Sequence, residues 1–137
     1  NKFVAGFIGS PTMNFLNGII EEKEGKMVIK MKGVCLEFPE SMKEKVKIHA
    51  GKEVTFGIRP EHISLGKEGD SNALNGNILV KEQMGNEEIV YFDCDGNQIT
   101  ARLTLNQEES LKLKDSGIFK IDMEKCHLFD LDTEGAI

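Results

Sequence analysis

A repeated pattern constrains the fold of this sequence more than any other feature. The segment Leu-Asn-Gly-Ile-Ile at 16–20 returns as Leu-Asn-Gly-Asn-Ile-Leu at 74–79, and the interval from residue 16 to residue 74 is 58 positions. A second match joins an alternating apolar run, a charged turn and a histidine, with an interval of 65 positions from residue 62 to residue 127. Because both matches occur in the same order, the chain is predicted to contain two copies of a small β unit. The matched residues are Val54, Phe56, Ile58, His62 and Ile63 in the first copy, and Phe119, Ile121, Met123, His127 and Leu128 in the second.

Alternating apolar and polar residues predict strands in both copies. Asp95-Gly96 lies between two alternating runs, which is a strong signal for a β-hairpin. The stretch 66–76 is the most loop-like and is the best internal boundary. We therefore expect an all-β, OB-like barrel or sandwich made of two similar halves, about 13–69 and 70–137, which pack together because each is too small to bury a core alone. The predicted strands are 26–32, 53–59, 76–83, 88–95, 98–105, 117–123 and 126–129.

Helix signals are scarce. Within 1–12, apolar residues from Phe3 to Ile8 fall at positions i, i+1, i+4 and i+5, and Pro11 supplies a stop. We expect this range to be the end of a linker helix that begins in a preceding segment. The range 39–47 is expected to form one short helical turn.

Charge argues against a polyanionic partner. Lys and Arg total 17 against 23 Asp and Glu, which gives a formal net charge of -6. Such a surface does not suit a phosphate backbone or an anionic membrane, so no nucleic-acid partner is expected. The acidic runs 21–24 and 86–88 are interpreted as solvated turn faces.

Cysteine and histidine spacing predicts no metal centre. Cys35, Cys94 and Cys126 are far apart and form no Cys-x-x-Cys pair, so buried reduced thiols are expected. The histidines do not recur at ligand spacing, and 93–98 supplies only the first part of a calcium loop. The chain also lacks a Gly-x-x-x-x-Gly-Lys-Ser/Thr segment, which excludes a phosphate-binding loop of that type.

The Arg-Pro-Glu-His segment at 59–62 offers an acid, a base and an anion clamp. Adjacent residues on an extended strand point to opposite faces, so Glu61 and His62 are poorly placed to share one site. The match between His62 and His127 favours a role in the shared fold, since one active site would not need the position twice. An enzyme that uses His62 or His127 remains a third hypothesis.

Four segments together resemble a known family. They are NKFVAGFIGSPTMNFLNG at 1–18, FGIRPEHI at 56–63, VKEQMGNEEIVYF at 80–92 and KCHLFDLDTEGAI at 125–137. They are similar to the C-terminal part of the ATP-binding subunits of sugar-import ABC transporters of the maltose and multiple-sugar type. The resemblance implies a regulatory domain of OB-type TOBE modules that follows an ATPase domain. It also implies that ATP and Mg bind in that preceding domain and that no cofactor binds in this chain.

The resemblance further implies a non-catalytic regulatory and dimerisation domain. Its implied partners are a second copy of itself, the transporter membrane subunits through the preceding domain, and a regulatory protein. Its implied place is cytoplasmic, peripheral on the inner face of the plasma membrane. The alternative is a TOBE module that senses a small ligand, an oxyanion or a sugar, with the loop 69–76 as the candidate binding segment.

The candidate site residues are interface or family-motif positions, and no catalytic, cofactor-binding or metal-binding residue is assigned. They are Asn14, Arg59, Pro60, Glu61, His62, Asn86, Glu87, Cys126, His127 and Phe129.

Overall fold

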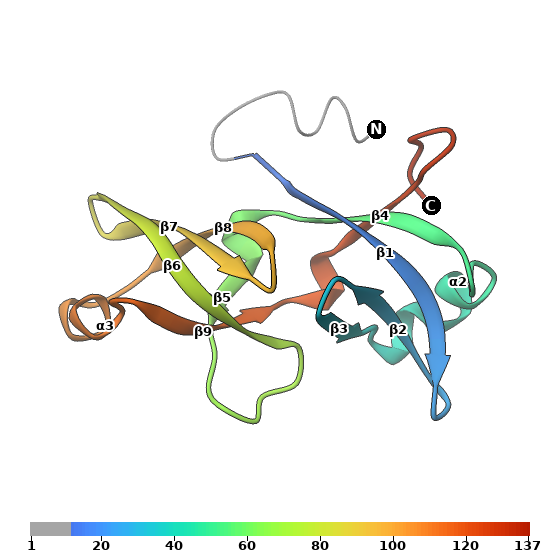
Figure 1. The fold of residues 1–137 in the computed structure, drawn as a ribbon, viewed down its shortest axis with the longest axis horizontal. Coiled ribbons are helices and arrows are strands. Elements are labelled where there is room, and N and C mark those ends of the chain that lie inside the picture. Colours follow the sequence, from blue (N-terminus) through green and yellow to red (C-terminus); the bar gives the residue numbers. More distant parts are fainter. Residues whose placement is uncertain (1–11) are drawn as a thin grey trace.

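Two five-stranded antiparallel sheets make up most of the fold. The computed structural model describes residues 12–137, so the linker helix expected at 1–12 lies almost wholly outside the described residues. The first sheet has the strand order β10-β4-β1-β2-β3 and the second has the order β5-β9-β6-β7-β8 (Figure 1). This confirms the all-β, OB-like prediction of two similar halves.

The elements follow one another in the same order in each half, except that the first half has one additional 3-10 turn before its helix. In the first half they are β1 (Asn14–Lys23), β2 (Lys26–Met31), β3 (Val34–Glu37), the 3-10 turn η1 (Glu40–Met42), α2 (Lys43–Lys47), β4 (Glu53–Ile58), the 3-10 turn η2 (Pro60–His62) and β5 (Ile63–Leu65). In the second half they are β6 (Ala73–Met84), β7 (Glu87–Cys94), β8 (Asn97–Thr104), α3 (Gln107–Lys112), β9 (Ser116–Ile121), the 3-10 turn η3 (Met123–Lys125) and β10 (His127–Asp130).

The two halves exchange their last strands. β4 belongs to the first sheet, but the chain passes through η2 and then adds β5 to the edge of the second sheet. In the same way β9 belongs to the second sheet, and η3 carries the chain back so that β10 pairs with β4. Each sheet therefore contains four strands of one half and one strand of the other.

Strand register corrects the interval of the second sequence match. Phe56 pairs with Leu16, and Phe119 pairs with Leu74, so Phe56 corresponds to Phe119 and the interval is 63 positions rather than 65. His62 ends η2, whereas His127 begins β10, so the two histidines are not equivalent. A shift of two residues keeps the same faces of a strand buried, which is why the alternation could not reveal it.

The repeated Leu-Asn-Gly has a packing role. A Cβ atom on Gly18 would lie 2.7 Å from Met31, and one on Gly76 would lie 2.3 Å from Phe92. The Phe92 ring is itself stacked on Phe119 with a centroid separation of 3.9 Å. Glycine at these positions lets the neighbouring strand's side chain cross over the backbone of β1 or β6 and reach the core.

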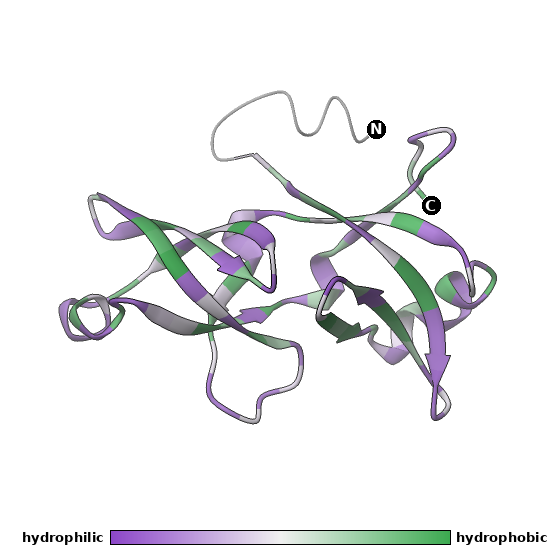
Figure 2. Ribbon diagram, in the orientation of Figure 1, coloured by the Kyte–Doolittle hydropathy of each residue, from purple (hydrophilic) through white to green (hydrophobic). Residues whose placement is uncertain are grey.

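One hydrophobic core joins the two sheets. Its buried side chains come from both halves and include Phe56, Phe92 and Phe119, each almost fully inaccessible to solvent. Hydrophobic residues follow the strands of both sheets, whereas the hairpin tips are hydrophilic (Figure 2). No helix among residues 12–137 is long and apolar enough to cross a membrane.

We predict that Gly76→Ala lowers the free energy of unfolding by about 1–3 kcal/mol, because the stacked Phe92 ring has no room to move away from the new methyl group. The matched control is Asn75→Ala, an exposed change on the same strand that should stay within about 0.5 kcal/mol of the parent. Urea denaturation measures both. Equal stabilities for the two variants would contradict the packing role.

Candidate functional site

The candidate residues fall into two groups. Eight lie on β1 and β10 or in the segments that cross between the two sheets, whereas Asn86 and Glu87 lie at the β6–β7 turn at the far end of the second sheet (Figure 1). Asn14, Pro60, Cys126 and Phe129 are buried, His62 and Glu87 are partly buried, and Arg59, Glu61, Asn86 and His127 are exposed.

The Arg-Pro-Glu-His segment forms a rigid turn between the sheets. Arg59 is extended, as expected for a residue before proline, and Pro60 is the first residue of η2. The His62 N–H donates to the Arg59 carbonyl at 2.9 Å, and the Asp122 N–H donates to the His62 carbonyl at 3.1 Å. The second bond joins this crossover to the equivalent crossover at η3. The segment thus positions the exchanged strands while Arg59 and Glu61 face solvent.

The fold brings Arg59, His62 and His127 together, although the two histidines are far apart in sequence. His127 pairs with Gly57 across β10 and β4, two residues before Arg59. The pKa of His127 is lowered, first because partial burial disfavours its charged form, and then because Arg59, His62 and Lys45 are positive neighbours. We call these four residues the basic cluster. Among residues 12–137 no group of three or more His, Cys, Asp or Glu side chains could hold a metal ion.

Phe129 and Cys126 are packed into the framework beside the basic cluster. The Phe129 ring meets Phe15 edge to face at 5.9 Å. A Cβ atom on Gly57 would lie 2.7 Å from the Met13 sulfur and 3.1 Å from Phe129, so these side chains close over β4. Burial raises the pKa of the Cys126 thiol to about 12, which makes it an unreactive structural cysteine.

Asn14 forms a clamp between the two sheets. Its Nδ2 donates to the Thr100 carbonyl at 2.9 Å and to the Ile58 carbonyl at 3.1 Å, and its Oδ1 accepts from the Thr100 N–H at 2.8 Å. Asn14 starts β1 of the first sheet, whereas Thr100 lies on β8 of the second. The buried asparagine therefore satisfies both backbone groups of one residue in the other half.

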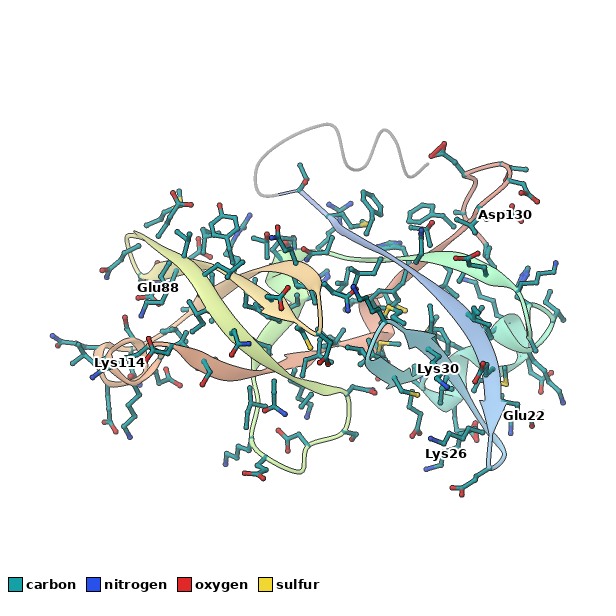
Figure 3. The ribbon with its side chains drawn as sticks, in the orientation of Figure 1. Glu22, Lys26, Lys30, Glu88, Lys114 and Asp130 are labelled. Carbon is teal, nitrogen blue, oxygen red and sulfur yellow. The ribbon has the colours of Figure 1, made fainter. Side chains whose placement is uncertain are left out.

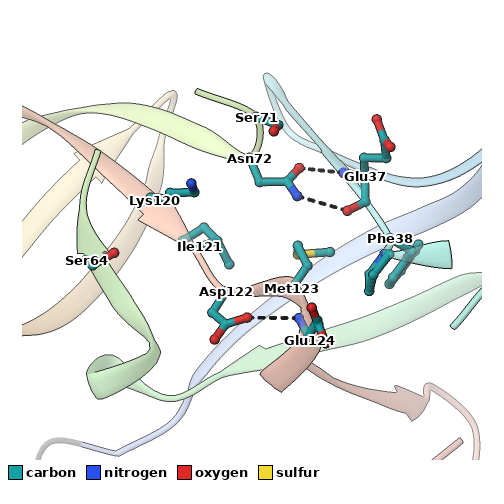
Figure 4. A pocket seen from close by; sticks show the side chains of 11 residues that line it. Glu37, Phe38, Ser64, Ser71, Asn72, Lys120, Ile121, Asp122, Met123 and Glu124 are labelled. Carbon is teal, nitrogen blue, oxygen red and sulfur yellow. Dashed lines mark hydrogen bonds between the residues drawn. The ribbon is translucent and has the colours of Figure 1, made fainter. Parts of the chain in front are cut away.

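A second clamp, not foreseen from the sequence, repeats this geometry. Asn72 Oδ1 accepts from the Glu37 N–H at 2.8 Å, and Asn72 Nδ2 donates to the Glu37 carbonyl at 3.0 Å (Figure 4). Asn72 follows Asn14 by 58 positions, and Thr100 follows Glu37 by 63, the intervals that relate the two halves. The sequence did contain a signal for this second clamp, because the repeated motif is Asn-x-Leu-Asn-Gly and not only Leu-Asn-Gly.

A cavity of about 420 Å³ lies beside the Asn72 clamp, at the junction of the two sheets (Figure 4). Its lining includes three carboxylates, those of Glu37, Asp122 and Glu124, and one ammonium group, that of Lys120. Asp122 is partly committed, since its side chain accepts from the Glu124 N–H at 3.2 Å. The excess of negative charge makes this cavity unfavourable for an anion.

The interpretation of 86–88 as a solvated turn face is wrong for Glu88. Its side chain is on β7 close to the β6–β7 turn (Figure 3), and the residue is only 5% exposed. Asn86 is exposed as expected, and Glu87 is partly buried. All three line a second cavity, of about 350 Å³, between this turn and α3.

The chain matches two family models. The model described as the MalK OB fold domain covers residues 9–63, and the model described as the TOBE domain covers residues 56–129. Both domain types are non-catalytic. The two matches overlap in the segment that contains the Arg-Pro-Glu-His turn.

Named relatives are ATP-binding proteins of importers. The chain is 36% identical to the oligosaccharides import ATP-binding protein MsmX of Bacillus subtilis, over 98% of this chain and 37% of that protein. It is 35% identical to the maltose/maltodextrin import ATP-binding protein MalK of Photobacterium profundum, over 96% of this chain and 35% of that protein. The chain thus spans a little more than a third of the length of these relatives.

A solved structure shares the fold. It is the cytoplasmic molybdate-binding protein ModG with molybdate bound, which superimposes with a TM-score of 0.61 at 18% sequence identity, covering 89% of this chain and 97% of that chain. At this identity the likeness concerns the fold alone.

We predict that Asn14→Ala lowers the free energy of unfolding by about 2–3 kcal/mol and Asn72→Ala by about 1–2 kcal/mol, because each leaves backbone groups of the opposite sheet without partners. The smaller value for Asn72 follows from its partial exposure. Asn77→Ala, an exposed asparagine on β6, is the control and should change stability by about 0.5 kcal/mol or less. Chemical denaturation of the three variants decides whether the clamps stabilise the fold.

We also predict that Arg59→Gln raises the pKa of His127, because it removes a positive charge that opposes protonation of the imidazole. Proton NMR titration of His127 measures the change. Lys114→Gln removes an equal charge at the far end of the molecule (Figure 3) and should leave the pKa of His127 in place. Identical titration curves for the parent and Arg59→Gln would show that the basic cluster is not assembled as described.

Proposed function

This chain belongs to the TOBE domain family, and from that premise we propose that it is a non-catalytic regulatory and dimerisation domain of the ATP-binding subunit of a carbohydrate ABC importer. The observation that carries the proposal is the joint match to the MalK OB fold domain and the TOBE domain over residues 9–129, together with relatives named for oligosaccharide and maltodextrin import. ATP and Mg, on this proposal, bind in a preceding ATPase domain, which also contacts the membrane subunits at the cytoplasmic face of the plasma membrane.

The surface proposed for dimerisation is the η2 turn. Arg59 and Glu61 are exposed with opposite charges on either side of the buried Pro60, which fixes their spacing. In a two-fold contact, Arg59 of each copy faces Glu61 of the other, so the patch is complementary to itself. Exposed ion pairs contribute only about 0–1 kcal/mol each, so their main effect is on the geometry and specificity of the contact.

The neighbouring basic cluster is the surface we propose for a regulatory protein. Arg59 and Lys45 are exposed cations beside His127, whose lowered pKa leaves it neutral at pH 7, and in a chain of formal net charge -6 they make this a local departure from the overall acidity. An acidic segment of a partner would find a complementary charge here. Because Arg59 belongs to both surfaces, binding of such a partner would compete with the two-fold contact.

A second candidate function is the sensing of a small ligand. The cavity of about 420 Å³ at the junction of the sheets favours it, since a ligand there would touch both halves. Its three carboxylates and single lysine do not suit an oxyanion such as molybdate, however. We therefore rank ligand sensing at this cavity below regulation and dimerisation.

Charge reversal tests the proposed two-fold contact. Arg59→Glu and Glu61→Arg should each weaken self-association in sedimentation equilibrium, because each places like charges opposite one another across the axis. An equimolar mixture of the two variants should associate again, since every contact then joins opposite charges. Asn86→Asp, a charge change at the remote β6–β7 turn, is the control. If the mixture of the two variants does not recover self-association, the proposed dimerisation surface is contradicted.

A further inference from the structure

The start of β10 carries an exposed histidine among cations. His127 is the first residue of β10, and Arg59 beside the η2 turn and Lys45 of α2 are exposed positive neighbours of its ring. These residues are far apart in the sequence, and the pairing of His127 with Gly57 across β10 and β4 helps to bring them to one surface. They are the members of the basic cluster that a partner in solvent can reach.

The fourth member of the basic cluster is less accessible. His62 is partly buried, and its Nδ1 atom is covered by protein and has no hydrogen-bond partner among the described residues. A partner in solvent cannot reach that nitrogen. His127 is therefore the histidine of this cluster whose charge a partner would meet.

The exposed cations are not neutralised within the part of the chain that the structure describes. Arg59, Lys45 and His127 form no ion pair with another residue in the range 12–137. The charges that act on the His127 imidazole, those of Arg59, His62 and Lys45, are all positive. An acidic group of a partner would therefore find no carboxylate of this chain already paired with these cations.

Other charged side chains on the elements around His127 do not alter this picture. Asp122 is committed elsewhere, since its carboxylate accepts from the Glu124 N–H at 3.2 Å and its charge acts on Cys126. The remaining charged residues of these elements are all at least partly exposed to solvent, which weakens their effect. They are Lys43, Glu44 and Lys47 on α2, Glu53 on β4, Glu61 on η2, Glu124 and Lys125 on η3, and Asp130 on β10.

The charge of His127 changes just below neutral pH. Partial burial, followed by the positive charges of Arg59, His62 and Lys45, lowers the pKa of His127 from its ordinary value of 6.5. His127 is therefore neutral at pH 7.5, and it gains a proton only as the pH falls below about 6.5. A bound acidic group stabilises the protonated imidazole, so by linkage the affinity for that group rises as the pH falls.

We propose that the basic cluster binds an acidic peptide segment of a partner more tightly as the pH falls from 7.5 to 5.5, with His127 as the residue that adds the charge. Arg59 and Lys45 supply an attraction that does not change in this range, and His127 supplies the part that does. This inference rests on the proposed use of the cluster by a regulatory protein and adds a pH dependence to it.

NMR titration of the 137-residue chain with hexa-aspartate tests the inference. The peptide keeps nearly all its charge at pH 5.5, because an aspartate side chain has an ordinary pKa of about 3.9. The protein stays above its isoelectric point of about 5.1. At low ionic strength, the Kd obtained from the amide signals of Arg59, His62 and His127 should be about two- to fivefold lower at pH 5.5 than at pH 7.5, because one exposed ion pair is added.

Variants assign the pH dependence to one residue. His127→Gln should remove most of the difference between the two Kd values, because glutamine cannot gain a proton in this range. His49→Gln, which changes the histidine outside the basic cluster, is the matched control and should keep the ratio of the parent. Arg59→Gln should weaken binding at both pH values by about two- to fivefold, because it removes a permanent charge. Amide spectra recorded without peptide check that each variant is folded.

The outcomes separate this inference from the function on which it rests. Equal Kd values at the two pH values, or an unchanged ratio in His127→Gln, would overturn the pH dependence and leave the regulatory surface in place. Absence of shifts at these residues at both pH values would overturn the regulatory surface and the pH dependence together.

Discussion

The rest of this structure depends on one constraint, which is that each half supplies an edge strand to the sheet of the other half. Each sheet lacks an edge strand until the other half supplies it, through β5 or β10. The asparagine clamps act across the same junction, because Asn14 holds β8 and Asn72 holds β3. Strand exchange and clamps together make the halves inseparable, so one core forms instead of two. The exposed η2 turn and the basic cluster exist only because these crossovers bring distant segments together.

Sequence patterns were sufficient for the fold class, most of the strands and the Asp95-Gly96 hairpin, because alternation and turn chemistry are local properties. These patterns did not predict that β5 and β10 are exchanged between the two sheets. β5 has three residues, and nothing local determines which sheet so short a strand joins. The choice rests on long-range pairing with β9, while the alternation in β4 and β9 fits intervals of 63 and 65 equally well.

The candidate site residues also divide into features that the local sequence predicts and features that depend on contacts between distant segments. Pro60 predicted a bend, and η2 is a bend. The proximity of Arg59 to His127 could not be read from spacing, since it depends on β10 pairing with β4. Glu88 was missed for a related reason. A glutamate beside a turn is normally solvated, and only the packing of α3, with Ser110 and the carbonyls that hold Lys81, buries it.

The placement of β10 also has a consequence for how the chain is made in the cell. A ribosome releases β4 long before β10, the last strand of the described chain, so β4 emerges without one of its two neighbours. The β4 edge, which carries Val54, Phe56 and Ile58, stays open throughout translation of the second half. Open edges of this kind invite pairing with other nascent chains. The first sheet can therefore be completed only after β10 has been synthesised.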